Sequence, residues 1–210
     1  LLSLPAVTLC VNSAAAAESY AQWLDLDKDL FPVHYNGIDF ESMEAINTTD
    51  NTGPSRIDLG IPSDSVLIGS VFRLTDEKRP LLWVDVAARV LQELPKVHFV
   101  IVGGGAMLAK TSRYAKSLGI LDHLHLPGQS SNVKAWLDMM DIFLFTSRVE
   151  GLPNVLIEAQ GFGVPVVTTD AGGSREVIIH GESGWLVEGP KVRDISDRLL
   201  WCLNNPEWLK

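Results

Sequence analysis

Short apolar runs alternate with longer amphipathic stretches from Ser65 to the end of the chain. Each apolar run has the length and composition of a strand buried on both faces, and each stretch between two runs has room for a helix. We expect strands at Val66–Val71, His98–Val102, His123–Leu126, Ile142–Phe145, Val166–Thr168 and Trp185–Val187. We expect helices at Pro80–Glu93, Ala106–Leu118, Asn132–Met139, Pro153–Phe162, Ser174–Ile179 and Val192–Leu203. This alternation predicts an α/β fold with a Rossmann-like parallel sheet, helices on both faces and right-handed crossovers.

The chain before Ser65 lacks this regular alternation and divides into two parts. Two short strands and the helix between them are expected at Thr8–Val11, Phe31–Tyr35 and Ala14–Leu24. A polar stretch with Gly53-Pro54 follows, which is typical of a linker, and a short helix is expected near its end. We therefore predict a small N-terminal part at residues 1–40, a linker at 41–62 and the α/β domain at 63–210.

Ligands of open parallel sheets bind in the crevice outside the carboxyl ends of the strands. In the predicted sheet these ends lead into the loops Phe72–Arg79, Gly103–Ala106, Gly128–Asn132, Ser147–Asn154 and Asp170–Ser174. The residues that carry the chemistry of this protein are therefore expected in these loops.

Two acidic residues flank a predicted helix start in one of these loops. Glu150 follows the strand Ile142–Phe145, and Glu158 lies within the next helix, about a turn and a half beyond Pro153. Free N–H groups at a helix start favour an anion, and carboxylates accept hydrogen bonds from sugar hydroxyls. This order suits a ligand with hydroxyls at both ends and phosphates between them, such as a nucleotide-sugar. The alternative is that both glutamates are solvated surface acids.

Two cations follow the first strand of the predicted sheet. Arg73 and Lys78 could neutralise a diphosphate, the arginine through its planar fork and the lysine as a point charge. The alternative is that both are solvated surface charges, as most such residues are. Arg79, which directly follows Lys78, is expected to be a surface residue.

Composition and missing motifs exclude several functions. The net charge of −9 argues against a nucleic-acid partner, and two cysteines are too few for a disulfide framework. No apolar segment reaches the length of a membrane span. Gly103-Gly-Gly105 departs from the dinucleotide fingerprint, so it indicates a tight turn, a close backbone approach to a nucleotide, or both. The five histidines lack metal-ligand spacing, so we predict no metal site.

Together these motifs carry a family resemblance. The segment Glu150–Glu158, E-G-L-P-N-V-L-I-E, resembles the glutamate-x7-glutamate motif of the family 4 glycosyltransferases, retaining enzymes of the GT-B fold in the glycosyl transferases group 1. The resemblance also covers Arg73–Lys78, Val100–Gly105, Pro127-Gly128 and Asp170–Glu176, and Asn36–Asp39 is similar to the junction between the two GT-B domains. It implies that most of the chain is a C-terminal, donor-binding domain.

The resemblance also implies roles for individual residues. Arg73 and Lys78 would hold the donor diphosphate, Glu150 would contact the sugar hydroxyls and Glu158 would contact the ribose hydroxyls. The remaining donor-binding positions would be Gly103, Gly104, Ser130, Gly151, Leu152, Pro153, Asn154 and Val155. Neither a cofactor nor a metal is expected, because the cations and the helix start would stabilise the leaving diphosphate.

The implied activity is retaining transfer of a sugar, with a UDP-sugar as the expected donor, to a saccharide or lipid-linked acceptor in polysaccharide synthesis. The acceptor would bind through an N-terminal domain that is largely missing, so we expect a fragment that binds its donor without turnover. The expected location is the cytoplasm, and the missing domain could bring the protein to the inner membrane face. Two alternatives stay open: a non-catalytic nucleotide-sugar-binding module, or another GT-B enzyme such as a nucleotide-sugar epimerase.

Overall fold

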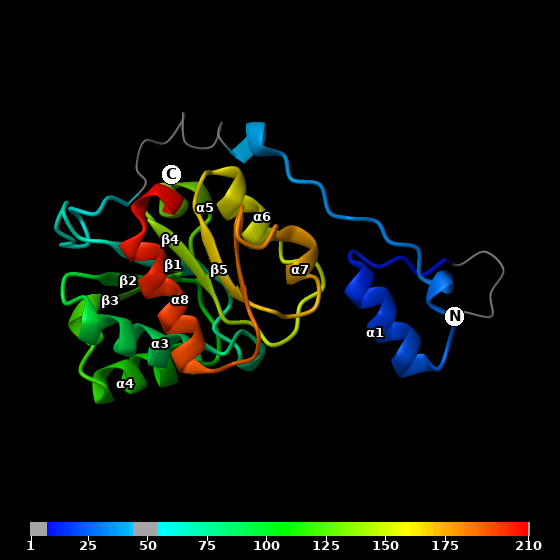
Figure 1. Ribbon diagram of the computed structural model, residues 1–210, viewed down its shortest axis with the longest axis horizontal. Helices are drawn as coiled ribbons and strands as arrows, with labels where there is room; N and C mark the ends of the chain where they lie inside the picture. The colour runs from blue at the N-terminus through cyan, green and yellow to red at the C-terminus, as the bar shows by residue number, and fades with distance from the viewer. Residues whose placement is uncertain (1–7, 44–53, 210) are drawn as a thin grey trace.

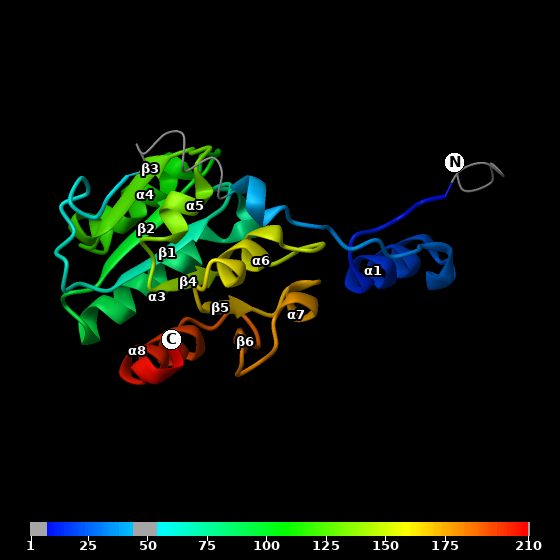
Figure 2. The same cartoon turned by 90° about the horizontal axis from the view of Figure 1, so that it is seen from above.

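A parallel sheet of six strands, in the order β3-β2-β1-β4-β5-β6, forms the centre of the computed structural model, which describes residues 8–43 and 54–209 (Figures 1 and 2). The strands are β1 (Leu67–Val71), β2 (His98–Val102), β3 (Leu124–Gly128), β4 (Ile142–Phe145), β5 (Val166–Thr169) and β6 (Gly184–Val187). Every pair of neighbours runs parallel, which confirms the predicted Rossmann-like fold.

Helices cover both faces of this sheet (Figure 1). They are α3 (Pro80–Glu93), α4 (Leu108–Ser117), α5 (Val133–Leu137), α6 (Asn154–Gly161), α7 (Ser174–Val177) and α8 (Val192–Asn204). Helices α3, α4 and α8 pack on one face, and α5, α6 and α7 lie on the other. In this domain each predicted element lies within two residues of its observed bounds. Among the described residues, no helix combines the length and apolar character that crossing a membrane requires.

The four central strands, β2, β1, β4 and β5, are buried on both faces, which explains why they are largely apolar. All four residues of β4 are buried, and Phe99 of β2 and Trp83 of α3 are fully buried. The rings of Trp83 and Phe99 meet edge to face with centroids 5.8 Å apart. Each such side chain contributes about 1.5–3 kcal/mol through burial, so the core fixes the sheet beneath the loops.

The strand order reverses between β1 and β4, and the two strands are paired only in part. Their ladder covers Ile68 and Gly69 of β1 and stops before the carboxyl ends of the strands. Beyond it, the buried Ser70 hydroxyl donates to the carbonyl of Leu144 and accepts a 2.7 Å hydrogen bond from Trp83 Nε1. A side chain thus replaces the ladder where the sheet opens, which is the position at which doubly wound sheets bind ligands.

The N-terminal part consists of α1 (Ala14–Leu24) and a 3-10 helix, η1 (Lys28–Leu30), and lies beyond α7 at one end of the molecule (Figure 2). The prediction of two short strands here is wrong, because one parallel bridge between Val11 and Val33 is their only pairing in the described chain. Ala17, Ala21 and Phe31 form a small cluster of their own beside this bridge. Two extended segments without a wider sheet have few partners for a ladder.

The predicted linker lies partly outside the described residues. Residues 40–43 are helical, and residues 56–60 form turns rather than the short helix that we predicted. Gly60 takes a φ of +68°, and Pro62 follows it, which ends any helical path. Arg56 anchors this stretch by donating to the carbonyl of Met139 at 2.6 Å and to Asp141 at 2.7 Å. The proposed domain boundaries stay predictions.

We expect Ser70→Ala to lower the free energy of unfolding by about 1–2 kcal/mol, because the carbonyl of Leu144 loses a buried donor. The loss is limited because Trp83 Nε1 already lies 3.2 Å from that carbonyl. Urea denaturation measures the effect. Ser117→Ala is the matched control, since its exposed hydroxyl donates to Tyr114 only within one helix, and it should change stability by less than about 0.5 kcal/mol. Equal stability of the Ser70 variant and wild type would contradict the role of this bridge.

Candidate functional site

Two loops face each other where the strand order reverses. The first follows β1 and contains η2 (Asp76–Lys78), and the second follows β4. The carbonyl of Glu77 accepts the N–H of Arg148 at 2.7 Å and the hydroxyl of Ser147 at 3.1 Å. The hydroxyl of Thr146 donates to the carbonyl of Lys78 at 2.9 Å. These bonds hold the cationic loop and the acidic loop together.

An ion pair joins the tips of these two loops. Lys78 Nζ donates to a carboxylate oxygen of Glu150, and the two side chains are only 17% and 10% exposed. The Lys78 ammonium also lies 5.2 Å from the centre of the Phe145 ring. In such a poorly solvated position each charge would be costly without the other. The structure therefore brings the predicted phosphate-binding cation and the predicted sugar-binding acid into direct contact.

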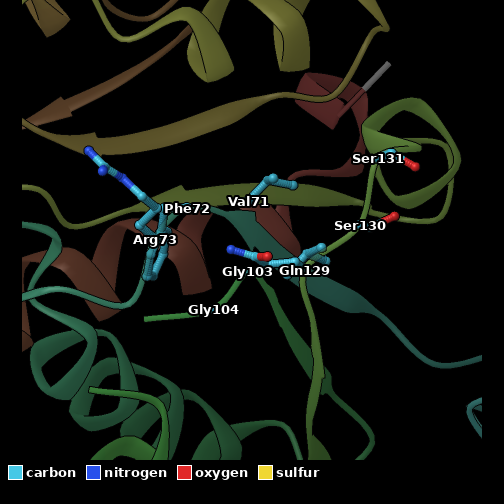
Figure 3. A pocket seen from close by; sticks show the side chains of 9 residues that line it. Val71, Phe72, Arg73, Gly103, Gly104, Gln129, Ser130 and Ser131 are labelled. Atoms are coloured by element: carbon cyan, nitrogen blue, oxygen red, sulfur yellow. The ribbon is translucent and has the colours of Figure 1, made fainter. Parts of the chain in front are cut away.

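Two adjoining hollows form what we call the switch-point groove. The first, of about 460 Å³, is lined by Val71–Arg73, Lys78, Phe145, Glu150 and Leu152–Val155. The second, of about 490 Å³, is lined by Val71–Arg73, Val102–Gly104 and Gln129–Ser131. Figure 3 shows the second hollow, with Gln129 beside Gly103 and the Arg73 side chain extending away from both. Because Val71–Arg73 line both hollows, the groove is continuous across the switch, and each hollow has the size of a small-ligand site.

The groove brings together most of the predicted site residues. These are Arg73, Lys78, Gly103, Gly104, Ser130, Glu150, Leu152, Pro153, Asn154 and Val155. Gly151 instead lines a third hollow, of about 590 Å³, between the N-terminal part and the loop after β4. Glu158 lies further along α6 and lines none of these three hollows.

Helix α6 presents an open start to the groove. No side chain caps it, and Pro153 occupies the N-cap position. Glu158 is half-buried on this helix, and its carboxylate has neither a hydrogen bond nor an ion pair within residues 8–43 and 54–209. Burial raises the pKa of this carboxyl above its usual value of 4.5. The helix therefore offers amide donors at its start and, one turn later, an acceptor that no described residue engages.

Close packing of the loops explains two of the glycines. Gly103 has a φ of +144°, and a Cβ at this position would lie 1.9 Å from the carbonyl oxygen of Phe72. A Cβ on Gly173 would lie 2.0 Å from the carbonyl oxygen of Gly151, which accepts the Gly173 N–H at 3.0 Å. The Asp170–Ser174 loop thus supports the Glu150–Gly151 backbone, a role that the sequence left open.

Sequence reasoning missed two contacts from the N-terminal part. Asn12 Oδ1 accepts the N–H of Leu152 at 3.2 Å, and Asn36 Nδ2 donates to Asn154 Oδ1 at 2.7 Å. The only signal for either was Asn36, which begins the segment that resembles the interdomain junction. The acidic loop is therefore held from both parts of the chain.

Arg79 corrects another prediction, since it is not a solvated surface residue. It is half-buried, and its guanidinium donates to the carbonyls of Thr146 at 2.6 Å and Ser147 at 2.7 Å. Burial lowers the pKa of this guanidinium. Sequence spacing could not reveal this contact, because the two carbonyls belong to a strand end far along the chain.

Three of the histidines, His98, His123 and His125, lie together near β2 and β3 and line neither hollow of the groove. His98, at the amino end of β2, has its ring centroid 5.0 Å from that of His123 and 5.7 Å from that of His125. Burial lowers the pKa of both His98 and His125. Among the described residues, no three His, Cys, Asp or Glu side chains come together in a way that could hold a metal ion. The candidate site therefore consists of the cations, acids and amides of the switch-point groove.

With this geometry in view, comparison with known proteins identifies the family. The model of the glycosyl transferases group 1 matches residues 52–210. The chain belongs to this family. It is 40% identical over 188 residues to the Vi polysaccharide biosynthesis protein VipC/TviE of Salmonella typhi, a match that covers 90% of this chain and 32% of that protein. It is 30% identical over 201 residues to the D-inositol 3-phosphate glycosyltransferase of Mycolicibacterium smegmatis, covering 91% of this chain and 44% of that protein.

Two solved structures share the fold of this chain. Anabaena Alr3699/HepE, solved with UDP and glucose, superposes with a TM-score of 0.83 at 22% identity over 97% of this chain and 55% of that chain. The C-terminal domain of LpcC from Francisella tularensis superposes with a TM-score of 0.65 at 25% identity over 73% of this chain and 82% of that chain. This group 1 chain spans about a third to under a half of the length of the two curated relatives named above.

The raised pKa of Glu158 predicts a pH-dependent gain in stability for Glu158→Gln. The folded pKa exceeds the unfolded one, so ionisation opposes folding once the pH rises above the unfolded value. The variant should therefore unfold at a higher temperature than wild type at pH 7, and the difference should shrink as the pH falls to about 4, near the unfolded pKa of glutamate. Exposed Glu182→Gln is the control and should show no such trend. A Glu158→Gln variant that is less stable at pH 7 would show that the carboxylate has a partner.

Proposed function

We propose that this group 1 chain is the donor-binding part of a family 4, retaining glycosyltransferase that uses a UDP-sugar. The observation that carries the proposal is the convergence of Arg73, Lys78, Glu150 and the uncapped start of α6 on one hollow at the switch point. Two cations and a helix start suit a diphosphate, and a carboxylate suits sugar hydroxyls. The second hollow adjoins the first at Arg73 and gives room for a nucleoside.

The proposed chemistry is stabilisation of a leaving diphosphate. As the bond from the sugar to the diphosphate breaks, negative charge grows on UDP, and Arg73, Lys78 and the amides at the start of α6 compensate for it. Lys78 has Glu150 as its partner in the structure. A bound diphosphate would replace that carboxylate beside Lys78, and Glu150 would then accept hydrogen bonds from the sugar. Glu158 would accept hydrogen bonds from the ribose.

The names of similar proteins support the choice of donor and pathway. The Salmonella typhi relative is named for the biosynthesis of the Vi polysaccharide. An Escherichia coli relative, 29% identical over 157 residues, is named as a galactosyltransferase that uses UDP-Gal and a GlcNAc-diphosphoundecaprenol. Anabaena HepE was solved with UDP-glucose. We propose a UDP-hexose or UDP-N-acetylhexosamine donor and a saccharide or lipid-linked acceptor in polysaccharide synthesis.

The acceptor would bind on the side of the N-terminal part. Helix α1 exposes apolar side chains on this side, with Trp23 76% exposed and Tyr20 48% exposed. Large apolar groups that cluster in solvent commonly mark an interface. We propose that a further part of the acceptor-binding domain covers this face, and that the chain alone binds donor without turnover.

A calorimetric titration of the chain with UDP, GDP, ADP and their glucose conjugates tests the proposal. We expect UDP and UDP-glucose to bind, and to bind equally well with EDTA present, because the groove supplies its own cations. The absence of heat with every nucleotide would refute donor binding. Binding that EDTA abolishes would refute the metal-free site alone.

We expect Lys78→Ala to weaken UDP binding by about 1.5–3 kcal/mol, since a charged partner of the diphosphate is lost. Calorimetry measures the change. Lys96→Ala is the matched control, because Lys96 is an exposed lysine that also pairs with an aspartate, Asp64, and lies away from the groove. The control should bind UDP like wild type. Unchanged UDP affinity in the Lys78 variant would remove this residue from the site.

The two glutamates should differ in their effects on UDP and UDP-sugar. Glu158→Gln should weaken both by a similar amount, on the order of 1.5–3 kcal/mol, because both ligands carry the ribose. Glu150→Gln should weaken only the UDP-sugar, because UDP lacks the transferred sugar that Glu150 would contact, and Lys78 loses its competing partner. Parallel titrations of each variant with both ligands measure the difference. Equal losses at Glu150 would show that the two ends of the motif are assigned wrongly.

A further inference from the structure

Arg79 occupies an unusual backbone position beside the candidate site. It lies between Lys78 and Pro80, where α3 begins, and its φ is +50°. Long side chains seldom adopt this left-handed conformation, which suits glycine. The conformation therefore persists because contacts of the side chain hold it.

The Arg79 guanidinium reaches the ends of two other strands. It donates from Nε to the carbonyl of Thr146 at 2.6 Å, and from Nη2 to the carbonyl of Ser147 at 2.7 Å and to the hydroxyl of Thr169 at 3.0 Å. Thr146 and Ser147 directly follow β4, and Thr169 is the last residue of β5. One side chain thus connects the loop after β1 to the carboxyl ends of β4 and β5.

These contacts satisfy backbone carbonyls that lie beyond the end of a strand ladder. Thr146 and Ser147 are fully buried just after the ladder of β4 ends, so their carbonyls require other donors. The planar fork of arginine supplies several N–H groups at fixed angles, which a lysine cannot do. No carboxylate pairs with Arg79 among the described residues, so its contacts are backbone carbonyls and one hydroxyl. Arg79 therefore stabilises the backbone of the loop after β4 and does not neutralise a carboxylate.

We propose that Arg79 is a positioning residue that sets Glu150 against Lys78. It is covalently next to Lys78, and it holds the backbone from which the loop to Glu150 begins. If it is removed, the cation should stay on η2, but the acidic loop should lose its fixed distance from that cation. The ligand part of this inference rests on the proposed function, whereas the effect on the loop does not.

The test compares Arg79→Gly, Arg79→Lys and wild type. Glycine suits the φ of +50°, so Arg79→Gly removes the side chain and relaxes the backbone. We expect about a tenfold loss of UDP-glucose affinity and a loss of less than about threefold for UDP, because only the sugar needs Glu150 in place. Arg79→Lys should resemble the glycine variant, since its charge remains but its fork is lost. Millimolar guanidinium chloride should restore part of the UDP-glucose affinity of Arg79→Gly, which a role limited to stability would not allow.

Arg89→Lys is the matched control. Arg89 also uses its fork, to Ser196 at 2.7 Å and Asp197 at 2.8 Å, but it joins α3 to α8 away from the groove. This control should lose some stability and bind both ligands like wild type. Wild-type affinity for UDP-glucose in Arg79→Gly would overturn the inference.

Amide hydrogen exchange gives a readout that needs no ligand. In Arg79→Gly the amides of residues 146–152 should exchange faster, while those of β1 and β2 should keep their wild-type rates. Unchanged exchange at residues 146–152 would overturn the inference even if wild type bound no nucleotide. Failure of wild type to bind, together with local exchange confined to this loop, would instead refute the donor and leave the positioning role supported.

Discussion

Unpaired backbone at the switch between β1 and β4 is the constraint on which this structure depends. The ladder between these strands ends at Gly69, before the carboxyl ends are reached, and each end must then find other partners for its carbonyls. Below the opening, the hydroxyl of Ser70 donates a hydrogen bond to the carbonyl of Leu144. Above it, the guanidinium of Arg79 donates to the carbonyls of Thr146 and Ser147. The groove exists because side chains, rather than a ladder, close the sheet at this point.

The same opening concentrates charge that has few internal partners. Lys78 and Glu150 neutralise each other at the tips of the two loops, whereas Glu158 is half-buried, has no partner among the described residues and has a raised pKa. Ionised Glu158 therefore opposes folding at neutral pH, and the fold tolerates this cost because the apolar core below is extensive. An ionised carboxylate without a partner can accept a hydrogen bond from a hydroxyl group, because no other hydrogen bond must first be broken. The electrostatics at Glu158 thus lower the stability of the fold at neutral pH.

The order of strands and helices could be predicted because short apolar runs and longer amphipathic stretches alternate clearly in the sequence. The apolar runs of β2 and β4 indicate burial on both faces, and local glycines and prolines mark the helix ends. The buried face of α6 is harder to predict, because apolar residues lie around much of the helix. Leu156 is fully buried, whereas the neighbouring Val155 is only half-buried. The strands predicted in the N-terminal part failed because a strand needs neighbours, which a local pattern does not supply.

The residues of the groove could be predicted only where they belong to recognisable motifs. Arg73, Lys78 and Glu150 stand at strand ends, so topology alone brings them near one edge of the sheet. Arg79 differs, because its importance depends on which carbonyls lie within reach of its guanidinium, and these are set by the packing of β4 against β1.

The contacts between the two parts of the chain likewise could not be predicted from local sequence patterns. Glu176 accepts the N–H groups of Ala14 at 2.7 Å and Ala15 at 2.9 Å, while Asn12 accepts that of Leu152. The start of α1 is thereby held by α7, and the acidic loop is held by Asn12, two residues before that start. Gly173 packs on Gly151 between these contacts. A shift of the acidic loop would therefore also displace α7 and the N-terminal part. The loop that faces the groove is also the joint between the two parts of the chain.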